Sequence, residues 1–210
     1  MSNAGPKPLH VLLWGVLGLA LLSITLLFIQ SRQSRSGLPQ LFPVQPFTLT
    51  NQLGRPADLR DFTGKVWLAD IIFIRCAGPC PRMTEQMQKL QDRFSAEDDL
   101  RFATLTTDPE HDTPAVLKAY AEKFQANPAR WQFLTGPKPA IKALAADSLK
   151  LGAEEKAEAE QQDANDLFIH STVFVLIDKA GSVRGFYESL EPGFHEKITE
   201  DIHSLLREKR

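Results

Sequence analysis

The two cysteines of the chain, Cys76 and Cys80, lie in the segment FIRCAGPCPRM at residues 73–83. At this spacing they can form a disulfide, act as a redox pair or supply thiolates to a metal ion. A purely structural disulfide is a poor explanation, because closing so small a loop removes little entropy from the unfolded chain. The spacing therefore favours a reactive pair or a metal site.

The other potential soft ligands are the histidines and methionines. A structural zinc site normally has four protein ligands, so two cysteines would need two histidines beside them. Two thiolates and one imidazole would instead suit Cu(I). Taken alone, His170 is an ordinary histidine at the edge of a strand, and His111 is a surface residue. Met83 and Met87 fall on one face of an expected helix, which favours core packing over metal binding.

The segments on either side of the cysteines indicate how they are positioned. Residues 66–74, VWLADIIFI, form an almost continuous apolar run that is typical of a strand buried on both faces, with Asp70 as its exception. Pro81 follows the second cysteine and favours the start of a helix. The free N–H groups at a helix start stabilise a thiolate, so this position suits reactive cysteines.

Strand and helix patterns alternate along the rest of the chain. The segment before residue 65 predicts a strand and a loop with a helical turn, and residues 153–166 predict an exposed, partly helical insertion. Strands are expected at 100–107, 131–136 and in a hairpin over 171–187, and helices at 112–124, 138–152 and 194–209. Thr113 is the expected N-cap of the first of these helices. This order predicts an α/β fold, a thioredoxin-like sandwich.

An apolar segment precedes this domain. Residues 11–29 contain only Ser23 and Thr25 as weakly polar interruptions, and about 20 apolar residues suffice to cross a bilayer. A cleaved signal peptide would have a shorter apolar region and a small-residue cleavage site. We therefore expect one N-terminal transmembrane helix. The predicted organisation is a tail at 1–10, an anchor at 11–29, a tether at 30–41 and a thioredoxin-like domain at 42–210.

The charge distribution argues against nucleic-acid binding. All 26 acidic residues lie at or beyond Asp58, and the net charge is −2. Since no basic patch is interleaved with aromatic residues, no nucleic-acid partner is expected. Lys7 before the anchor and Arg32 and Arg35 after it are too evenly divided for the positive-inside rule to fix the orientation.

Four segments together resemble the SCO/SenC family of membrane-anchored copper proteins with a thioredoxin fold. They are RCAGPCP, TTDPEHDTPAVLKAYAEKF, WQFLTG and IHSTVFVLIDKAG, and the resemblance covers roughly residues 42–206. The family usually has proline directly after the first cysteine, where this chain has Ala77. The resemblance implies that Cys76 and Cys80 are thiolate ligands of copper and that His170 is the imidazole ligand. Asp108 and Asp112 match acidic positions of the same pattern.

The resemblance also implies a function, which is delivery of copper to the CuA centre of cytochrome c oxidase. A copper metallochaperone of this kind is not an enzyme, and its partners would be the copper-bearing oxidase subunit and a thiol reductant protein. The alternative is a membrane-anchored thiol–disulfide oxidoreductase in which Cys76 and Cys80 form the redox pair. The third ligand, His170, separates the two, because a dithiol reductase does not need it.

The expected location follows from the thiol chemistry. A reversible dithiol and copper delivery to a membrane oxidase both belong outside the reducing cytosol. We therefore expect a single-pass protein of the cytoplasmic (inner) membrane, with Met1 to Lys7 in the cytoplasm and the domain on the periplasmic side.

Overall fold

The strand that leads to the cysteines, β3 (Val66–Ile72), is buried along its whole length at the centre of a seven-stranded sheet. The computed structural model describes the backbone of residues 8–33, 37–152, 154–155, 168–169 and 172–208, and the side chains of 12–25, 37–152 and 172–208. The strand order is β2-β1-β5-β4-β3-β8-β9. β3 pairs parallel with β4 and antiparallel with β8, so the apolar run at 66–74 forms a strand buried on both faces, as predicted, although the strand ends at Ile72.

The other strands of this sheet are β1 (Thr48–Asn51), β2 (Pro56–Asp58), β4 (Leu100–Thr106), β5 (Trp131–Thr135), β8 (Val173–Ile177) and β9 (Val183–Glu188). The helices are α1 (Pro8–Gln33), α2 (Cys80–Arg93), α3 (Pro114–Lys123), α4 (Lys138–Lys142) and α5 (Phe194–Arg207), with a 3-10 turn η1 (Leu59–Phe62) and a π-helical turn η2 (Ala143–Ser148).

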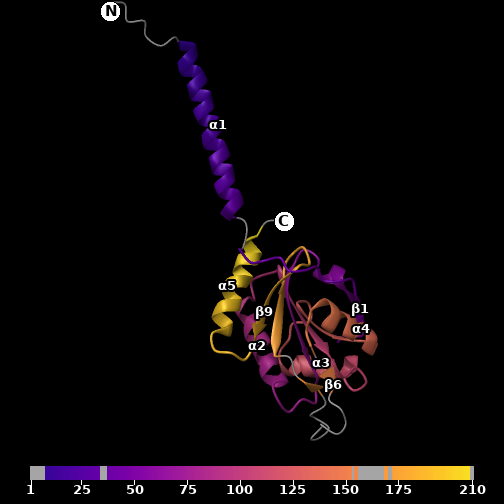
Figure 1. Cartoon of the computed structure of the whole chain (residues 1–210). Coiled ribbons are helices and arrows are strands. Elements are labelled where there is room, and N and C mark those ends of the chain that lie inside the picture. Colours follow the sequence, from indigo (N-terminus) through magenta and orange to yellow (C-terminus); the bar gives the residue numbers. More distant parts are fainter. Residues whose placement is uncertain (1–7, 34–36, 153, 156–167, 170–171, 209–210) are drawn as a thin grey trace, which may run out of the picture.

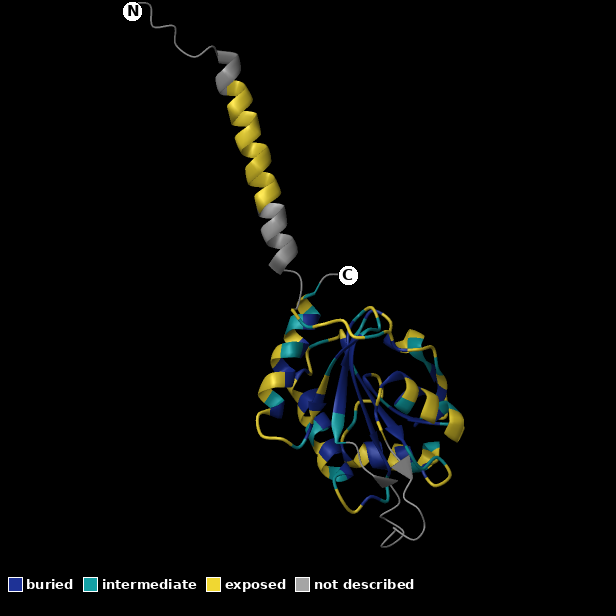
Figure 2. Cartoon of the chain, in the orientation of Figure 1, coloured by how far each residue is buried: buried dark blue, intermediate teal, exposed yellow. Residues whose placement is uncertain are grey.

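Helices cover both faces of the sheet, which gives two buried apolar layers (Figure 1, Figure 2). Alternate residues of β3 enter the two layers: Leu68 packs with α2, α3 and α5, whereas Trp67 packs with η1, α4 and η2. The α/β sandwich of thioredoxin type predicted from the sequence is therefore present. Thr113 caps α3 by accepting a hydrogen bond from the Val116 N–H, as expected.

One predicted helix differs from the structure. The helix expected over 138–152 is α-helical only to Lys142 and then widens into η2, where the Leu149 N–H donates to the Leu144 carbonyl. The wider turn directs Leu144, Ser148 and Leu149 into the protein, so burial overrides the regular helical repeat. Of the insertion expected at 153–166, the structure describes only β6 (Glu154–Glu155), which pairs with β7 (Phe168–Ile169) as a two-stranded ribbon. The part of it expected to be helical lies outside the described residues.

The N-terminal segment forms α1, a continuous helix that includes the whole predicted anchor at 11–29. The large apolar side chains described on it are exposed, as Figure 2 shows. Within the described residues, no helix reaches the combined length and hydropathy that a membrane crossing requires.

A buried arginine attaches the tether to the domain. Arg184 donates hydrogen bonds to the carbonyl oxygens of Leu38 and Pro39, at 2.7 and 3.0 Å, and forms ion pairs of 2.8 Å with Asp178 and Glu208. These contacts hold the chain at Leu38 and Pro39 against the domain.

Candidate metal and redox site

The two cysteines lie at the carboxyl edge of the central strands, where β3 gives way to α2. Cys80 is the first residue of α2, and Cys76 belongs to the connecting loop. Both side chains are buried: Cys76 is 5% exposed and Cys80 is 1% exposed. They do not form a disulfide in this structure. Cys76 has the largest influence on the pKa of the Cys80 thiol, so the fold places the two thiols near one another.

Local hydrogen bonds shape the cysteine loop. The Cys76 N–H donates to the Phe73 carbonyl at 3.2 Å, and the Gly78 N–H donates to the Cys76 sulfur at 3.3 Å. A backbone N–H directed at sulfur favours the thiolate, the form that binds metals and attacks disulfides. Pro79 precedes α2 and Pro81 lies in its first turn, so both prolines occupy positions where no helical N–H is needed.

The thiol of Cys80 does not have the low pKa expected at a helix start. Its neighbour Cys76 raises the pKa of Cys80 through their hydrogen bond, and burial raises it further. These two effects outweigh the favourable position at the end of the helix. Cys80 therefore keeps its proton to a higher pH than an ordinary thiol does.

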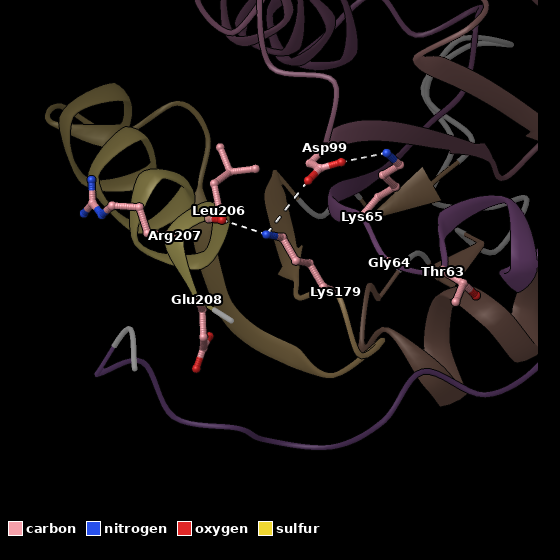
Figure 3. Close-up of a pocket in the computed structure, with 8 residues that line it drawn as sticks. All are labelled: Thr63, Gly64, Lys65, Asp99, Lys179, Leu206, Arg207 and Glu208. Carbon is pink, nitrogen blue, oxygen red and sulfur yellow. Dashed lines mark hydrogen bonds and ion pairs between the residues drawn. The ribbon is translucent and has the colours of Figure 1, made fainter. Parts of the chain in front are cut away.

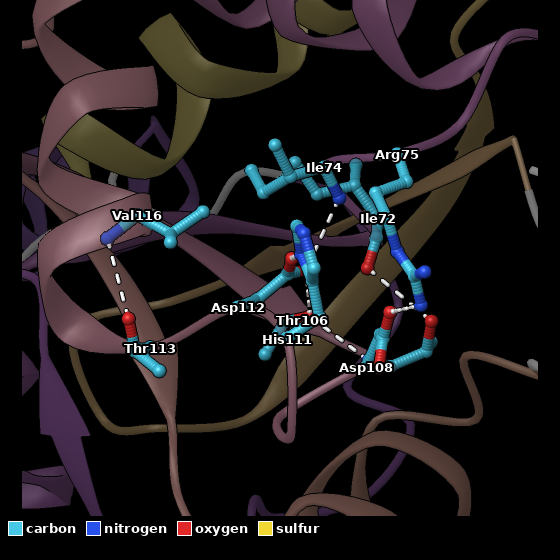
Figure 4. A network of polar contacts seen from close by, with 10 residues as sticks. Ile72, Ile74, Arg75, Thr106, Asp108, His111, Asp112, Thr113 and Val116 are labelled. Carbon is cyan, nitrogen blue, oxygen red and sulfur yellow. Dashed lines mark hydrogen bonds and ion pairs between the residues drawn. The ribbon is translucent and has the colours of Figure 1, made fainter.

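The loop between β4 and α3 lies beside the cysteine loop because β3 and β4 are parallel and end at the same edge. Figure 4 shows the contacts between the two loops. Arg75 pairs with Asp108 at 2.6 Å, and the Ile74 N–H donates to the carboxylate of Asp112 at 3.1 Å. The Thr106 hydroxyl also donates to Asp112, at 2.5 Å. Sequence reasoning did not identify Arg75 or Thr106, since only the fold brings them to the acidic residues.

Asp108, His111 and Asp112 form a compact group whose ligand atoms lie within 4.8 Å of one another. Each already has a protein partner. Asp108 is paired with Arg75, and His111 Nδ1 donates to Asp112 Oδ1 at 2.9 Å. His111 is partly exposed and Asp112 is fully buried. Their present contacts make these residues a support for the cysteine loop.

The predicted third ligand, His170, lies outside the described residues. The strand that follows it begins close to the cysteine edge of the sheet, because β8 runs antiparallel to β3 with Val175 opposite Ala69 and Ile177 opposite Trp67. The start of β8 therefore faces the end of β3, where the cysteine loop begins.

The two methionines of α2 are core residues. Met83 and Met87 are completely buried in the apolar layer that also contains Leu90 and Phe94. This outcome confirms the prediction from their helical spacing.

Asp70, the polar exception in β3, is fully buried, and neither of its carboxylate oxygens has a hydrogen-bond partner. Burial raises the pKa of Asp70 to about 7. Thr104, the residue paired with Asp70 on β4, acts in the opposite direction and lowers the pKa of Asp70. When ionised, Asp70 contributes to the raised pKa of Cys80.

A surface pocket elsewhere does not compete with the cysteines as a metal site. It lies near Lys65, which precedes β3, and therefore at the opposite end of the strand from Cys76 (Figure 3). Lys65 pairs with Asp99 at 2.7 Å, and Lys179 donates to the Leu206 carbonyl at 2.7 Å. The pocket has no thiol or imidazole, and its lining residues are Thr63, Gly64, Lys65, Asp99, Lys179, Leu206, Arg207 and Glu208.

Comparisons with known proteins place the chain in a family. A family model described as SCO1/SenC matches residues 39–207. The SCO1 protein homolog of Bacillus subtilis is 35% identical over 168 residues, which cover 79% of this chain and 84% of that protein.

Two solved structures show the same fold. One, reported with a disulfide switch, is BsSco, a member of the Sco family of cytochrome c oxidase assembly proteins. It is 36% identical with a TM-score of 0.69, and the match covers 81% of this chain and 97% of that one. The other is yeast Sco1 with copper bound, 25% identical with a TM-score of 0.62, covering 78% and 90% respectively.

Proposed function

This chain belongs to the SCO1/SenC family, and we propose that it binds copper and acts in the assembly of cytochrome c oxidase. The observation that carries the proposal is the pair of adjacent, reduced thiols of Cys76 and Cys80 at the carboxyl edge of the sheet. Copper is bound in the yeast Sco1 structure, and BsSco is described as an oxidase assembly protein.

The ligands in this proposal are Cys76, Cys80 and His170. Two thiolates and an imidazole are soft donors that suit Cu(I). His170 precedes β8 by only three residues, and three residues of chain span at most about 10 Å. Since β8 starts near the cysteine edge, this short connection supports an imidazole within reach of the thiols.

Copper enters this site as cargo, and the chain supplies the ligands. Binding displaces the protons of Cys76 and Cys80, so copper affinity should rise with pH. The raised pKa of Cys80 makes its proton hard to displace. A site with three protein ligands leaves room for a recipient's ligand to bind before the donor's ligands leave. We infer that the recipient is the CuA centre of the oxidase.

We further propose that residues 11–29 anchor the chain in the cytoplasmic membrane, with the domain on the periplasmic side. The largely apolar sequence of residues 11–29 and the helical backbone of α1 support the anchor. The dithiol supports the orientation, because a reversible disulfide persists only outside the reducing cytosol.

A second candidate function is thiol–disulfide exchange with a client protein, using a thiol reductant as electron donor. The proximity of the thiols of Cys76 and Cys80 favours it, since two cysteines four residues apart at a helix start can approach within bonding distance. A disulfide switch has been identified in the relative BsSco.

Replacing His170 with alanine separates the two functions. The His170→Ala variant should lose Cu(II) affinity strongly and Cu(I) affinity less, because two thiolates can hold Cu(I) in a linear arrangement. Oxidase maturation should fail in a host that depends on this protein, whereas reduction of a disulfide client should persist. Copper titration of the purified full chain and an oxidase assay in cells measure the two effects.

His203→Ala is a suitable control, because His203 lies on α5 in contact with the Phe94 ring and away from the cysteine loop. It should bind both copper states normally. If His170→Ala also binds both states normally and supports oxidase assembly, the copper role of His170 is wrong and the oxidoreductase function becomes the better account.

A further inference from the structure

The cysteine loop is attached to the β4–α3 loop at three positions. The Thr107 N–H donates to the Ile72 carbonyl at 2.9 Å, Asp112 accepts from the Ile74 N–H, and Arg75 pairs with Asp108. All three contacts fall within the four residues that precede Cys76. The neighbouring loop therefore holds the segment that leads to the first thiol.

Asp112 is the centre of this attachment (Figure 4). Its side chain is completely buried and accepts three hydrogen bonds, from the Ile74 N–H and the Thr106 hydroxyl at Oδ2 and from His111 Nδ1 at Oδ1. Thr106 in turn accepts a hydrogen bond from the Asp108 N–H at 3.0 Å. One carboxylate thus joins the end of β4, the start of α3 and the cysteine loop.

We propose that Asp112 is a positioning residue, which fixes the backbone before Cys76 and thereby holds the Cys76 sulfur beside Cys80 in the geometry that receives copper. The role in copper binding rests on the proposed function, but the positioning of the thiol does not. Hydrogen bonds from three donors restrain the carboxylate, and such bonds to a charged acceptor are stronger than neutral ones.

The same contacts argue against Asp112 as a metal ligand. Both of its oxygens are occupied by protein donors, and no part of the residue is exposed. Ligation would require the Ile74 or His111 hydrogen bond to break first. A supporting role for the carboxylate needs no such change.

The test compares variants at two positions of the network in the full chain. Asp112→Ala removes the carboxylate, and Thr106→Val removes one of its donors at nearly constant volume, whereas Thr106→Ser keeps the hydroxyl. Alkylation of Cys76 in the reduced, metal-free protein should accelerate about tenfold in Asp112→Ala and less in Thr106→Val, because a lost hydrogen bond to a charged group lets the loop open more often. Fragmentation of the alkylated peptide assigns the modification to Cys76 or Cys80.

Thr104→Val is the matched control, since Thr104 is equally buried on the same strand but bonds to Trp131 and not to the loop. It should leave Cys76 alkylation unchanged even if it lowers thermal stability. Thr106→Ser should restore the wild-type rate, which a general loss of stability would not explain.

Copper binding provides the second readout. Affinity should fall by about 10- to 100-fold in Asp112→Ala, as for other partners that orient metal ligands, and the thiolate-to-Cu(II) absorption should change shape. If wild-type protein binds no copper, the proposed function fails while the alkylation result still tests the positioning. The inference is wrong if Cys76 is alkylated at the wild-type rate in both Thr106→Val and Asp112→Ala. If Asp112→Ala does not fold, a wild-type rate in Thr106→Val alone overturns it.

Discussion

Replacing either cysteine with serine should lower copper affinity by more than about 100-fold. This loss exceeds the one that is typical when a residue that only orients a metal ligand is replaced. A serine hydroxyl is a harder donor than a thiolate and stays protonated at neutral pH, so it cannot replace sulfur toward Cu(I). The fold should persist in Cys76→Ser and Cys80→Ser, because serine is close in size to cysteine. Competitive titration of each full-length variant against a Cu(I) chelator gives the affinities.

Met83→Leu is the matched control for these variants. Met83 lies on α2 about one turn after Cys80 and also carries sulfur, but it is buried in the apolar core. A volume-conserving change there should cost less than about 1.5 kcal/mol of stability and leave copper affinity unchanged. Loss of copper in Met83→Leu with retention in Cys80→Ser would contradict the assignment of the ligands.

The second large effect concerns the buried carboxyl of Asp70. Its pKa is about 7 in the folded chain, against 3.8 for an ordinary aspartate. The folded chain therefore keeps a proton that the unfolded chain releases, so this group's contribution to stability is present below about pH 4 and is lost as the pH rises to about 7. The loss amounts to about 4 kcal/mol of unfolding free energy.

Asp70→Asn should remove this pH dependence, because asparagine has nearly the same shape and no charge. The variant should be more stable than wild type at pH 8 and close to it at pH 4, as measured by urea unfolding of the reduced chain. Asp92 is exposed, so Asp92→Asn serves as a control. Its unfolding free energy should depend on pH as that of the wild type does. If the unfolding free energy of Asp70→Asn still falls between pH 4 and pH 7 as steeply as that of the wild type, Asp70 does not cause the pH dependence.

Much of the architecture could be predicted from local sequence patterns. The apolar run at 66–74, the spacing of Met83, Met87, Leu90 and Phe94, and the Thr113-Pro114 cap each specify an element through nearby residues. Because a strand followed by a helix places the intervening loop at one edge of a sheet, the site of Cys76 and Cys80 also followed from the sequence.

The features that sequence reasoning missed depend on how the folded chain packs rather than on local sequence patterns. The pKa of Cys80 is raised by the neighbouring thiol of Cys76 and by burial, and these outweigh the helix start that the sequence predicted. The support of the cysteine loop by Asp112 and Thr106 depends on the parallel pairing of β3 with β4. Likewise, the widening of the helix after Lys142 follows from the burial of Leu144 and Leu149 against the sheet.

The most direct test of the copper assignment is the copper content of the full chain in its two thiol states. Reduced and disulfide-bonded protein would each be incubated with excess copper, freed of unbound metal and analysed for copper per chain. The thiolate ligands exist only in the reduced form, so we expect about one copper per reduced chain and none on the oxidised chain. Equal copper at unchanged affinity on the oxidised chain would contradict the assignment of Cys76 and Cys80 as the copper ligands.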